Sequence, residues 1–294
     1  MSLASTVITA IGYRIGEGEA ITASSKPVNL ASCLQWLNET ALWITGICAE
    51  NESDLGRTIG TVTTIHAHIT AATKAADCSI TATSHGLISS GTCEAVVKDV
   101  VGMTELNDTE YTATYVSANA LTLGVASTAY TTYASGGYVT KRKYTDLATT
   151  LYTPAHLRDQ DGEIYNGWIV DGHSRNKLTL ISESGLGDYD PVEATEPSEY
   201  YVDGSNNICF PSYPDAAYVV KIPYYQMPTA LTAVTDTMPF LGLMDNVFIE
   251  AVTWRSQNRD EYDVSGELKW MSFCLDRVRR VIQMRKKMTS SVGL

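Results

Sequence analysis

The sequence predicts an α+β fold: a helical bundle from the N- and C-terminal helices, a central antiparallel β domain, and a small all-β domain inserted into it. Near both termini, apolar residues recur every three to four positions, as they do on the buried face of a helix. Between these regions, β-branched residues alternate with small or polar ones, which is typical of strands. Within the β region, one stretch has a composition of its own, rich in Thr, Ser, Ala and Gly.

Composition and charge exclude several classes of protein. The chain has 294 residues, of which 44% are hydrophobic and 18% charged, so it is too apolar to be disordered. Its formal net charge is −12, whereas a protein whose whole surface binds nucleic acid would be basic. There is no run of 18 apolar residues that would predict a membrane span, and the first residues lack the basic region of a signal peptide.

Two helices are expected before the β region. The first covers about Ser5 to Ile15 and is followed by Gly16, a common stop signal. The second has Asn29 as a plausible N-cap, and its apolar stripe runs from Leu30 to Cys48. Both patterns have the period of helices that bury one face.

The strand pattern begins near Thr58 and is clearest as one strand over residues 61–69. A hairpin is expected across Asp203-Gly204-Ser205-Asn206, which is a strong turn signal. Pro223, within a strand predicted over 217–225, indicates an edge or end position for that residue. The remaining strands are expected at 79–83, 93–101, 110–116, 120–123, 137–140, 147–151, 163–170, 177–181, 198–202 and 207–210.

Two further helices are expected at the C-terminal end, over about Leu243 to Arg259 and Gly266 to Lys287. In the second, Leu268, Met271, Leu275, Val278 and Ile282 form the expected buried stripe. Helices from both ends can pack in one layer with the β material to one side. The domain prediction is therefore a core of residues 1–65 and 143–294, with 66–142 as an inserted small β domain.

Known catalytic motifs are missing from the sequence. It contains no G-x-S-x-G, no phosphate-binding loop and no H-E-x-x-H. His66 and His68 would share a strand face, but no third metal ligand is evident. Gly172-His173-Ser174 is interpreted as a loop, and Asp159-Gln-Asp-Gly162 as a turn that lacks the later acids of a calcium loop. No catalytic, cofactor or metal site is predicted, and the chain is not expected to be an enzyme.

The six cysteines have long, irregular spacings that match neither a zinc site nor a disulfide scaffold. We therefore expect reduced and mostly buried thiols in a protein made in a cytoplasm.

The distribution of basic residues is more informative. Six of the 21 bases lie in the last helix and its exit. They fit two interpretations, namely favourable placement at a helix C-terminus on a solvated face, or a surface that docks an acidic protein partner or nucleic acid. These candidate partner-binding residues are Arg277, Arg279, Arg280, Arg285, Lys286 and Lys287.

The second half of the chain also carries a series of motifs in a fixed order. They are Leu151-Tyr-Thr-Pro154, Ile208-Cys-Phe-Pro211, Tyr213-Pro-Asp-Ala-Ala-Tyr218, Lys221-Ile-Pro-Tyr-Tyr225, Met227-Pro228, and the helices 245–254 and 267–280. Together with the order of helices and strands, they resemble the head-to-tail adaptor proteins, also called connector or neck proteins, of tailed double-stranded DNA bacteriophages. The resemblance covers about residues 1–65 and 143–290.

The inserted segment has a resemblance of its own. It is carried by Ser84-His-Gly-Leu87, Val101-Gly-Met-Thr-Glu-Leu-Asn107, Tyr111, Val116, Asn119 and Leu121. These residues look like a small β module found in many phage structural proteins, which is often likened to a domain of ubiquitin-activating enzymes. No ubiquitin chemistry follows, because a fold does not carry a function.

The resemblance implies a structural virion protein without a cofactor. Such a protein would form a ring, commonly of twelve copies, between the portal and the tail or nozzle proteins in the virion neck, after assembly in the host cytoplasm. DNA would pass through the ring without specific binding, because tight phosphate binding needs Lys and Arg, and no membrane is involved. A tail-associated carbohydrate- or receptor-binding protein is the alternative, because the Thr-rich module also suits an adhesin. A virion-borne enzyme, such as a cell-wall hydrolase, is a third class.

Overall fold

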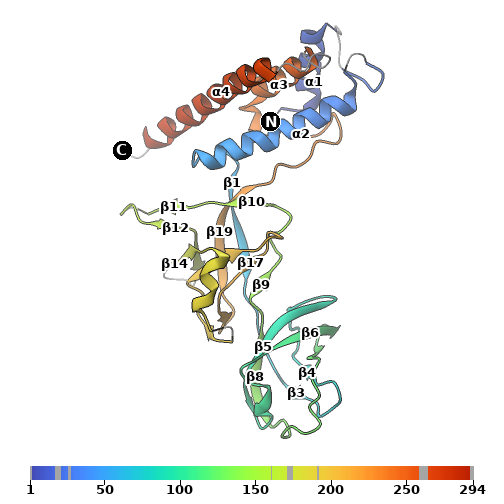
Figure 1. Cartoon of the computed structure of the whole chain (residues 1–294), viewed down its shortest axis with the longest axis vertical. Helices are drawn as coiled ribbons and strands as arrows, with labels where there is room; N and C mark the ends of the chain where they lie inside the picture. The colour runs from blue at the N-terminus through green and yellow to red at the C-terminus, as the bar shows by residue number, and fades with distance from the viewer. Residues whose placement is uncertain are drawn as a thin grey trace. The chain divides into compact units, whose positions relative to one another are not determined.

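The computed structural model describes residues 2–16, 21–25, 28–159, 161–170, 175–190, 192–257 and 264–291. The chain divides into two compact units. One unit, here the helical unit, combines Met1–Thr58 with Tyr225–Leu294, and the other, the β unit, is Ile59–Tyr224. Figure 1 shows that the four long helices belong to the first unit and nearly all strands to the second. The α+β class is therefore as predicted.

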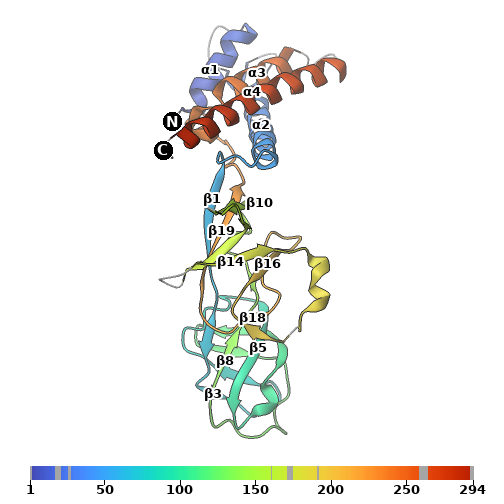
Figure 2. The same ribbon diagram turned by 90° about the vertical axis from the view of Figure 1, so that its left-hand side faces the viewer.

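The helical unit is organised around α3. Its helices are α1 (Ala4–Ile15), α2 (Leu30–Glu50), α3 (Asp245–Gln257) and α4 (Val264–Ser291). α3 contacts each of the other three, and α2 also contacts α4 (Figures 1 and 2). The residues that fill the space between them are Val7, Ile8, Ile11, Leu37, Ile44, Phe248, Val252, Val278 and Ile282, all buried.

Local signals set the helix ends where the sequence placed them. Asn29 caps α2 by accepting a hydrogen bond from the Ser32 amide at 2.9 Å. α1 stops at Gly16, whose φ of 88° suits glycine. The expected stripe of α4 needs a correction, because Met271 is 37% exposed and Cys274 takes its place beside Val278 and Ile282. The side chain of Leu268 lies outside the described residues.

The main sheet of the β unit has eight strands in the order β1-β19-β13-β14-β16-β17-β9, with β10 also paired to β19. Its buried cluster includes Val62, Ile169, Tyr200, Phe210 and Ile222. The strands are β1 (Arg57–Thr63), β9 (Lys143–Tyr144), β10 (Leu151–Pro154), β13 (Gly167–Val170), β14 (Arg175–Leu180), β16 (Glu199–Val202), β17 (Ile208–Cys209) and β19 (Val219–Gln226).

The expectation of an antiparallel domain is wrong for two pairs of strands, β14 with β16 in the main sheet and the short pair of residues 194–195 with 213–214. β14 and β16 are parallel, with Thr179 opposite Glu199 and Leu180 opposite Tyr200. Residues 181–198, which include the short helix η2 (Glu183–Asp188), connect the end of β14 to the start of β16, so that the two strands run in the same direction. A parallel neighbour requires a crossover of about this length, whereas a tight turn gives an antiparallel one. The predicted hairpin of β16 and β17 is present and antiparallel.

Short ladders complete the unit. β11 (Leu157–Arg158) pairs with β12 (Ile164–Tyr165) in an antiparallel hairpin, and β15 (Ala194–Thr195) pairs in parallel with β18 (Tyr213–Pro214).

A second sheet of seven antiparallel strands is built from residues 66–140. The order is β2-β8-β5-β6-β7-β4-β3. Its strands are β2 (His66–His68), β3 (Ala71–Ala72), β4 (Ser79–Thr81), β5 (Thr92–Val101), β6 (Thr109–Ser117), β7 (Ala120–Thr122) and β8 (Ser135–Thr140), and η1 (Thr104–Leu106) joins β5 to β6.

This second sheet curls on itself and encloses its own core. The two end strands, β2 and β3, are consecutive in the chain, and the Ile69 and Thr70 amides between them donate to carbonyls of Gly137 and Thr81. Ile69, Val97 and Leu121 are among the residues that fill it. That 66–142 folds as an independent inserted domain stays a prediction, which the deletion described in the Discussion tests.

Three local expectations are wrong for tertiary reasons. The strand predicted over 61–69 breaks at Thr64 and Ile65, where the chain passes from one sheet to the other. Thr64 bonds the carbonyls of residues 216 and 218, and the Ile65 amide donates to the Tyr144 hydroxyl. Residues 147–150 are a turn, not a strand, because amides there bond carbonyls three or four residues back. Pro223 is not on an edge strand, since β19 lies between β1 and β13.

Candidate partner-binding surfaces

Two of the residues considered for catalysis or metal binding, His66 and Asp159, make structural contacts. No group of three or more His, Cys, Asp or Glu that could hold a metal occurs among the described residues. His66 stacks on Tyr138 at 3.9 Å between ring centroids. In the predicted turn at Asp159, the Lys177 ammonium pairs with Asp159 and Glu163. This hydrogen bond from Lys177 lowers the pKa of Asp159. Residues 172–174 lie outside the described residues.

The cysteines match the expectation of buried thiols. All six are unpaired, five are buried and Cys93 is partly buried. Burial raises the pKa of Cys33, Cys48 and Cys274 to about 12. A thiol with so high a pKa is protonated at neutral pH and is a poor nucleophile. In the described residues, no helix is both long and apolar enough to cross a membrane.

Three of the six candidate bases on α4 contact neighbouring segments and fasten the helix to them. Arg277 pairs with Glu250 of α3 at 2.9 Å. Arg285 donates from Nε to Asp54 at 2.8 Å, and Lys286 donates to the carbonyl of Asn51, just after α2, at 2.8 Å. These contacts hold the C-terminal half of α4 against α2 and α3, so much of the predicted basic cluster has a structural role.

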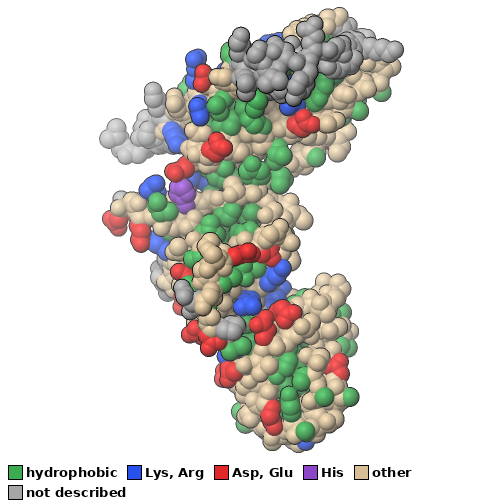
Figure 3. Space-filling view, in the orientation of Figure 1, with side chains coloured by type: hydrophobic (Ala, Val, Ile, Leu, Met, Phe, Trp, Pro, Cys, Tyr) green, Lys and Arg blue, Asp and Glu red, His purple; other side chains and the backbone are tan. Residues whose placement is uncertain are grey.

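Arg279 and Arg280 are exposed, and neither has an ion pair with a described residue. The side chain of Lys287 lies outside the described residues. Figure 3 shows Lys and Arg side chains gathered over the C-terminal half of α4.

Sequence reasoning missed two apolar residues beside these arginines. Phe273 is 48% exposed and Met284 is 60% exposed. With Arg277 and Arg280 they stand at spacings of four, three and four, so they share one side of the helix, opposite the buried Cys274, Val278 and Ile282. We call Phe273, Arg277, Arg280 and Met284 the outer face of α4. Arg, Phe and Met are enriched at protein interfaces.

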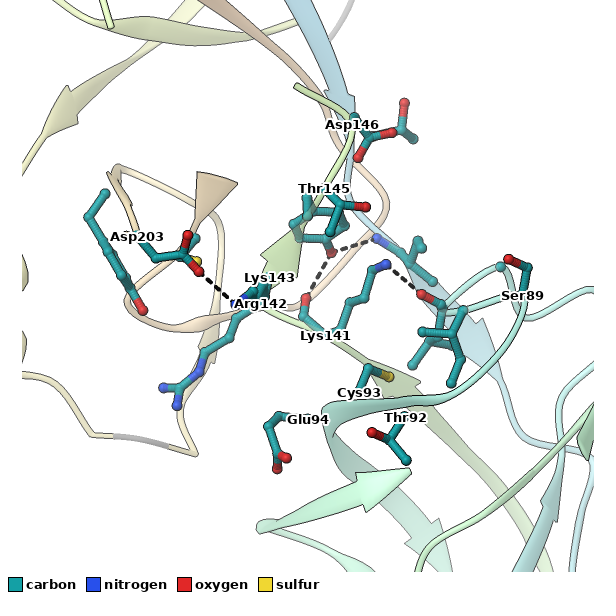
Figure 4. Close-up of a pocket in the computed structure, with 18 of the residues that line it drawn as sticks. Ser89, Thr92, Cys93, Glu94, Lys141, Arg142, Lys143, Thr145, Asp146 and Asp203 are labelled. Carbon is teal, nitrogen blue, oxygen red and sulfur yellow. Dashed lines mark hydrogen bonds and ion pairs between the residues drawn. The ribbon is translucent and has the colours of Figure 1, made fainter. Parts of the chain in front are cut away.

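A cleft of about 980 Å³ opens in the β unit, where the two sheets meet. Three consecutive bases line it, and Figure 4 shows two of their contacts. Lys141 donates to the Leu87 carbonyl, Arg142 pairs with Glu110 at 3.3 Å, and Lys143 pairs with Asp203 at 2.6 Å. Since each base already has a partner, the cleft is a junction between the sheets and not a preformed anion site.

Tyr144 reinforces this junction. Its hydroxyl accepts from the Ile65 amide at 3.0 Å and donates to the Lys141 carbonyl at 2.8 Å, so one buried side chain holds both strands of the connection. Its ring packs edge-on against Phe210 at 5.6 Å. Burial raises the pKa of Tyr144 above its ordinary value, which keeps the hydroxyl protonated as a donor at physiological pH.

A smaller open hollow, of about 450 Å³, lies in the helical unit. Its wall includes Asp54, Arg57, Met227, Pro228, Phe240 and Arg285.

These features define a class of protein. The described residues offer surfaces suited to protein contacts, in the outer face of α4 and the hollow, and no constellation for catalysis. The family model of the SU10 adaptor protein matches residues 106–291, more than half of the chain. The chain therefore belongs to the SU10 adaptor protein family and is a structural adaptor of a bacteriophage. This family points away from an enzyme. No curated protein matches the chain.

The match confirms the predicted resemblance to phage adaptors. It begins within the second sheet and runs to the last helix, so it includes α4 and every strand of the main sheet except β1. The resemblance of residues 84–121 to a phage β module stays a prediction.

Proposed function

We propose that the protein forms an oligomeric ring between the portal and the tail, where it extends the DNA channel and provides the platform on which the tail docks. Membership of the phage adaptor family, matched over residues 106–291, is the observation that carries this proposal. An adaptor has to bind other virion proteins, and a ring of twelve copies would present one copy of each docking surface per subunit.

The outer face of α4 is the proposed docking surface for the portal. Of the candidate residues Arg277, Arg279, Arg280, Arg285, Lys286 and Lys287, we expect Arg280 of this face and the neighbouring Arg279 to contribute most to recognition, since both are exposed and neither has an ion pair with a described residue. Arg285 and Lys286 instead keep the helix in place. Phe273 and Met284 add apolar area at the two ends of the surface. Such a face fits a partner surface that has an acidic centre with apolar residues beside it.

The net charge supports the channel role. The β unit has 19 acidic and nine basic residues. A surface with this balance repels phosphates, because stable binding to DNA depends on its neutralisation by Lys and Arg. DNA could therefore slide past the ring without being held. In this proposal the protein is a component of the virion neck that assembles in the host cytoplasm.

Co-sedimentation with the purified portal ring tests the docking surface. We expect the wild-type chain to travel with the portal, and the variant Arg279→Gln/Arg280→Gln to bind more weakly and with a shallower dependence on salt. Lys74→Gln/Lys98→Gln is the matched control, because it removes two positive charges from the second sheet. Undiminished binding of the Arg279/Arg280 variant would exclude α4 as the docking surface.

A further inference from the structure

The hollow in the helical unit contains a cation without a counterion. Arg57 stands in its wall, half-buried, and its guanidinium has no hydrogen bond or ion pair with any residue that the structure describes. The other guanidinium, that of Arg285, donates to Asp54 at 2.8 Å. The wall therefore holds two positive charges against one negative charge, in a protein whose net charge is −12. This local excess favours a carboxylate or another anion beside Arg57.

The rest of the wall mixes polar residues (Thr45, Thr58, Gln226 and Thr229) with apolar ones, and part of it is rigid. Met227 is 38% exposed, and it is followed by Pro228. Methionine adapts its shape to different apolar partners, and proline keeps the backbone beside it fixed. The hollow therefore offers a ligand both a charged group, the Arg57 guanidinium, and an apolar surface, formed by Met227 and Pro228.

Phe240 forms another part of the wall and has a strained backbone. Its φ is 60°, a value that bulky residues rarely adopt. The conformation keeps its ring stacked on Phe248 at 6.5 Å and close to Gly56, where an added Cβ would lie 3.3 Å from the ring. Strain of this kind is retained where the surrounding structure holds a residue in place, and it is found most often at binding sites.

We propose that this hollow receives an extended segment of the protein to which the adaptor docks. A carboxylate of that segment pairs with Arg57, and a neighbouring apolar side chain packs on Met227 and Phe240. Nucleic acid fits less well, because a single guanidinium without an ion pair to a described residue, in one small hollow, offers little to a phosphate backbone. A metal ion lacks ligands, since the one carboxylate present is bound to Arg285. The inference rests on the proposed function, in which the chain binds another virion protein.

The first experiment uses the full-length chain and short overlapping peptides that tile the portal and tail proteins, each labelled with fluorescein. Binding is measured by fluorescence anisotropy. We expect the peptides that bind to carry Asp or Glu next to a large apolar residue. Arg57→Gln should weaken the best of them by about tenfold, which is the effect of losing one charge-assisted contact. Arg158→Gln, which removes an exposed guanidinium from the β unit, should change binding by less than about twofold.

Three results would overturn the inference. They are the failure of every tiled peptide to bind the wild-type chain, binding that is unchanged in Arg57→Gln, and displacement of the peptide by an equal concentration of duplex DNA. Circular dichroism of Arg57→Gln, matched to the wild type, ensures that a loss of binding is not a loss of fold.

A second experiment separates this inference from the proposed function. A photocrosslinking amino acid at Met227 is introduced into the full chain, which is mixed with the portal ring and irradiated. A crosslink to a portal segment that contains an acidic residue supports the inference. If the chain co-sediments with the portal and no crosslink forms, the hollow is not the site, although the adaptor role stands. If the chain does not co-sediment, while a peptide from a tail protein binds through Arg57, the portal-docking role fails and the hollow remains a binding site.

Discussion

Replacement of Phe248 tests whether the helical unit and the β unit unfold separately. Phe248 is fully buried in α3, the helix that contacts the other three, and its ring stacks on Phe240. A phenylalanine side chain buries about 150–250 Å². At about 25 cal/mol per Å², this corresponds to about 4–6 kcal/mol, an upper estimate. Measured substitutions of buried Phe by Ala cost about 3–5 kcal/mol. We therefore expect Phe248→Ala to lower the free energy of unfolding of the helical unit by about 4 kcal/mol.

Urea unfolding followed by tryptophan fluorescence measures this loss. Four of the five tryptophans belong to the helical unit, and Trp168 belongs to the β unit. Fluorescence of a Trp168→Phe chain therefore reports the helical unit alone. Phe210→Ala is the matched control in the β unit, where Phe210 is buried against Tyr144. It should leave the helical transition in place. A loss of less than about 1 kcal/mol in Phe248→Ala, or an equal shift from Phe210→Ala, would refute the reasoning.

Three further predictions concern separate parts of the chain. Replacing residues 70–141 with a short Gly-Ser linker should leave the helical unit folded and able to bind the portal, as circular dichroism and co-sedimentation would show; an unfolded product would disprove the inserted domain. Gly102→Ala should destabilise the second sheet by more than Gly91→Ala, measured by amide hydrogen exchange in β5 and β6. Both glycines have a positive φ, but a Cβ at Gly102 would lie 2.3 Å from the Thr132 carbonyl oxygen, whereas Gly91 has nothing within 4 Å. The pKa of Asp236 is lowered by hydrogen bonds from the Thr232 and Ala233 amides. Its ionised form is thus favoured in the folded state, so its contribution to stability is present above the ordinary pKa of 3.8 and is lost as the pH falls through the folded value. Asp236→Asn should consequently lower the melting temperature of the helical unit at pH 6 and have a diminishing effect towards pH 3; an effect that is constant with pH would contradict this.

The helices were predictable because their signals are local. The Asn29 cap, the stop at Gly16 and the apolar period of α2 depend only on residues within a few turns of one another. The same is true of the hairpin between β16 and β17, which its turn residues specify.

The errors come from contacts between residues far apart in the sequence. Thr64 ends β1 because it bonds residues 216 and 218, and no pattern around Thr64 indicates this. The parallel pairing of β14 with β16 likewise depends on how residues 181–198 return to the sheet. Strand periodicity predicts that a strand exists, whereas its neighbour and direction are set by the tertiary fold.

The position of the candidate site was predictable from the sequence. Which of its bases hold the helix in place and which are exposed to a partner was not. Six bases near the end of the chain are visible in the sequence, yet Arg285 is bound to Asp54, 231 residues earlier. Only the fold could separate it from the exposed arginines. Phe273 and Met284 could have been found, since their spacing of 11 residues places them on one side of a helix. They were missed because Met271 and Leu275 were assigned to the buried stripe, and the exposed side of the helix was then not searched for apolar residues.

Electron microscopy of the purified chain mixed with its portal, beside the portal alone, tests the central claim most directly. The account predicts a second ring stacked on the portal and aligned with its channel, with a copy number that can be counted from the images. Portal rings without added density, while both proteins are folded, would contradict the adaptor ring and favour a tail-associated carbohydrate- or receptor-binding role.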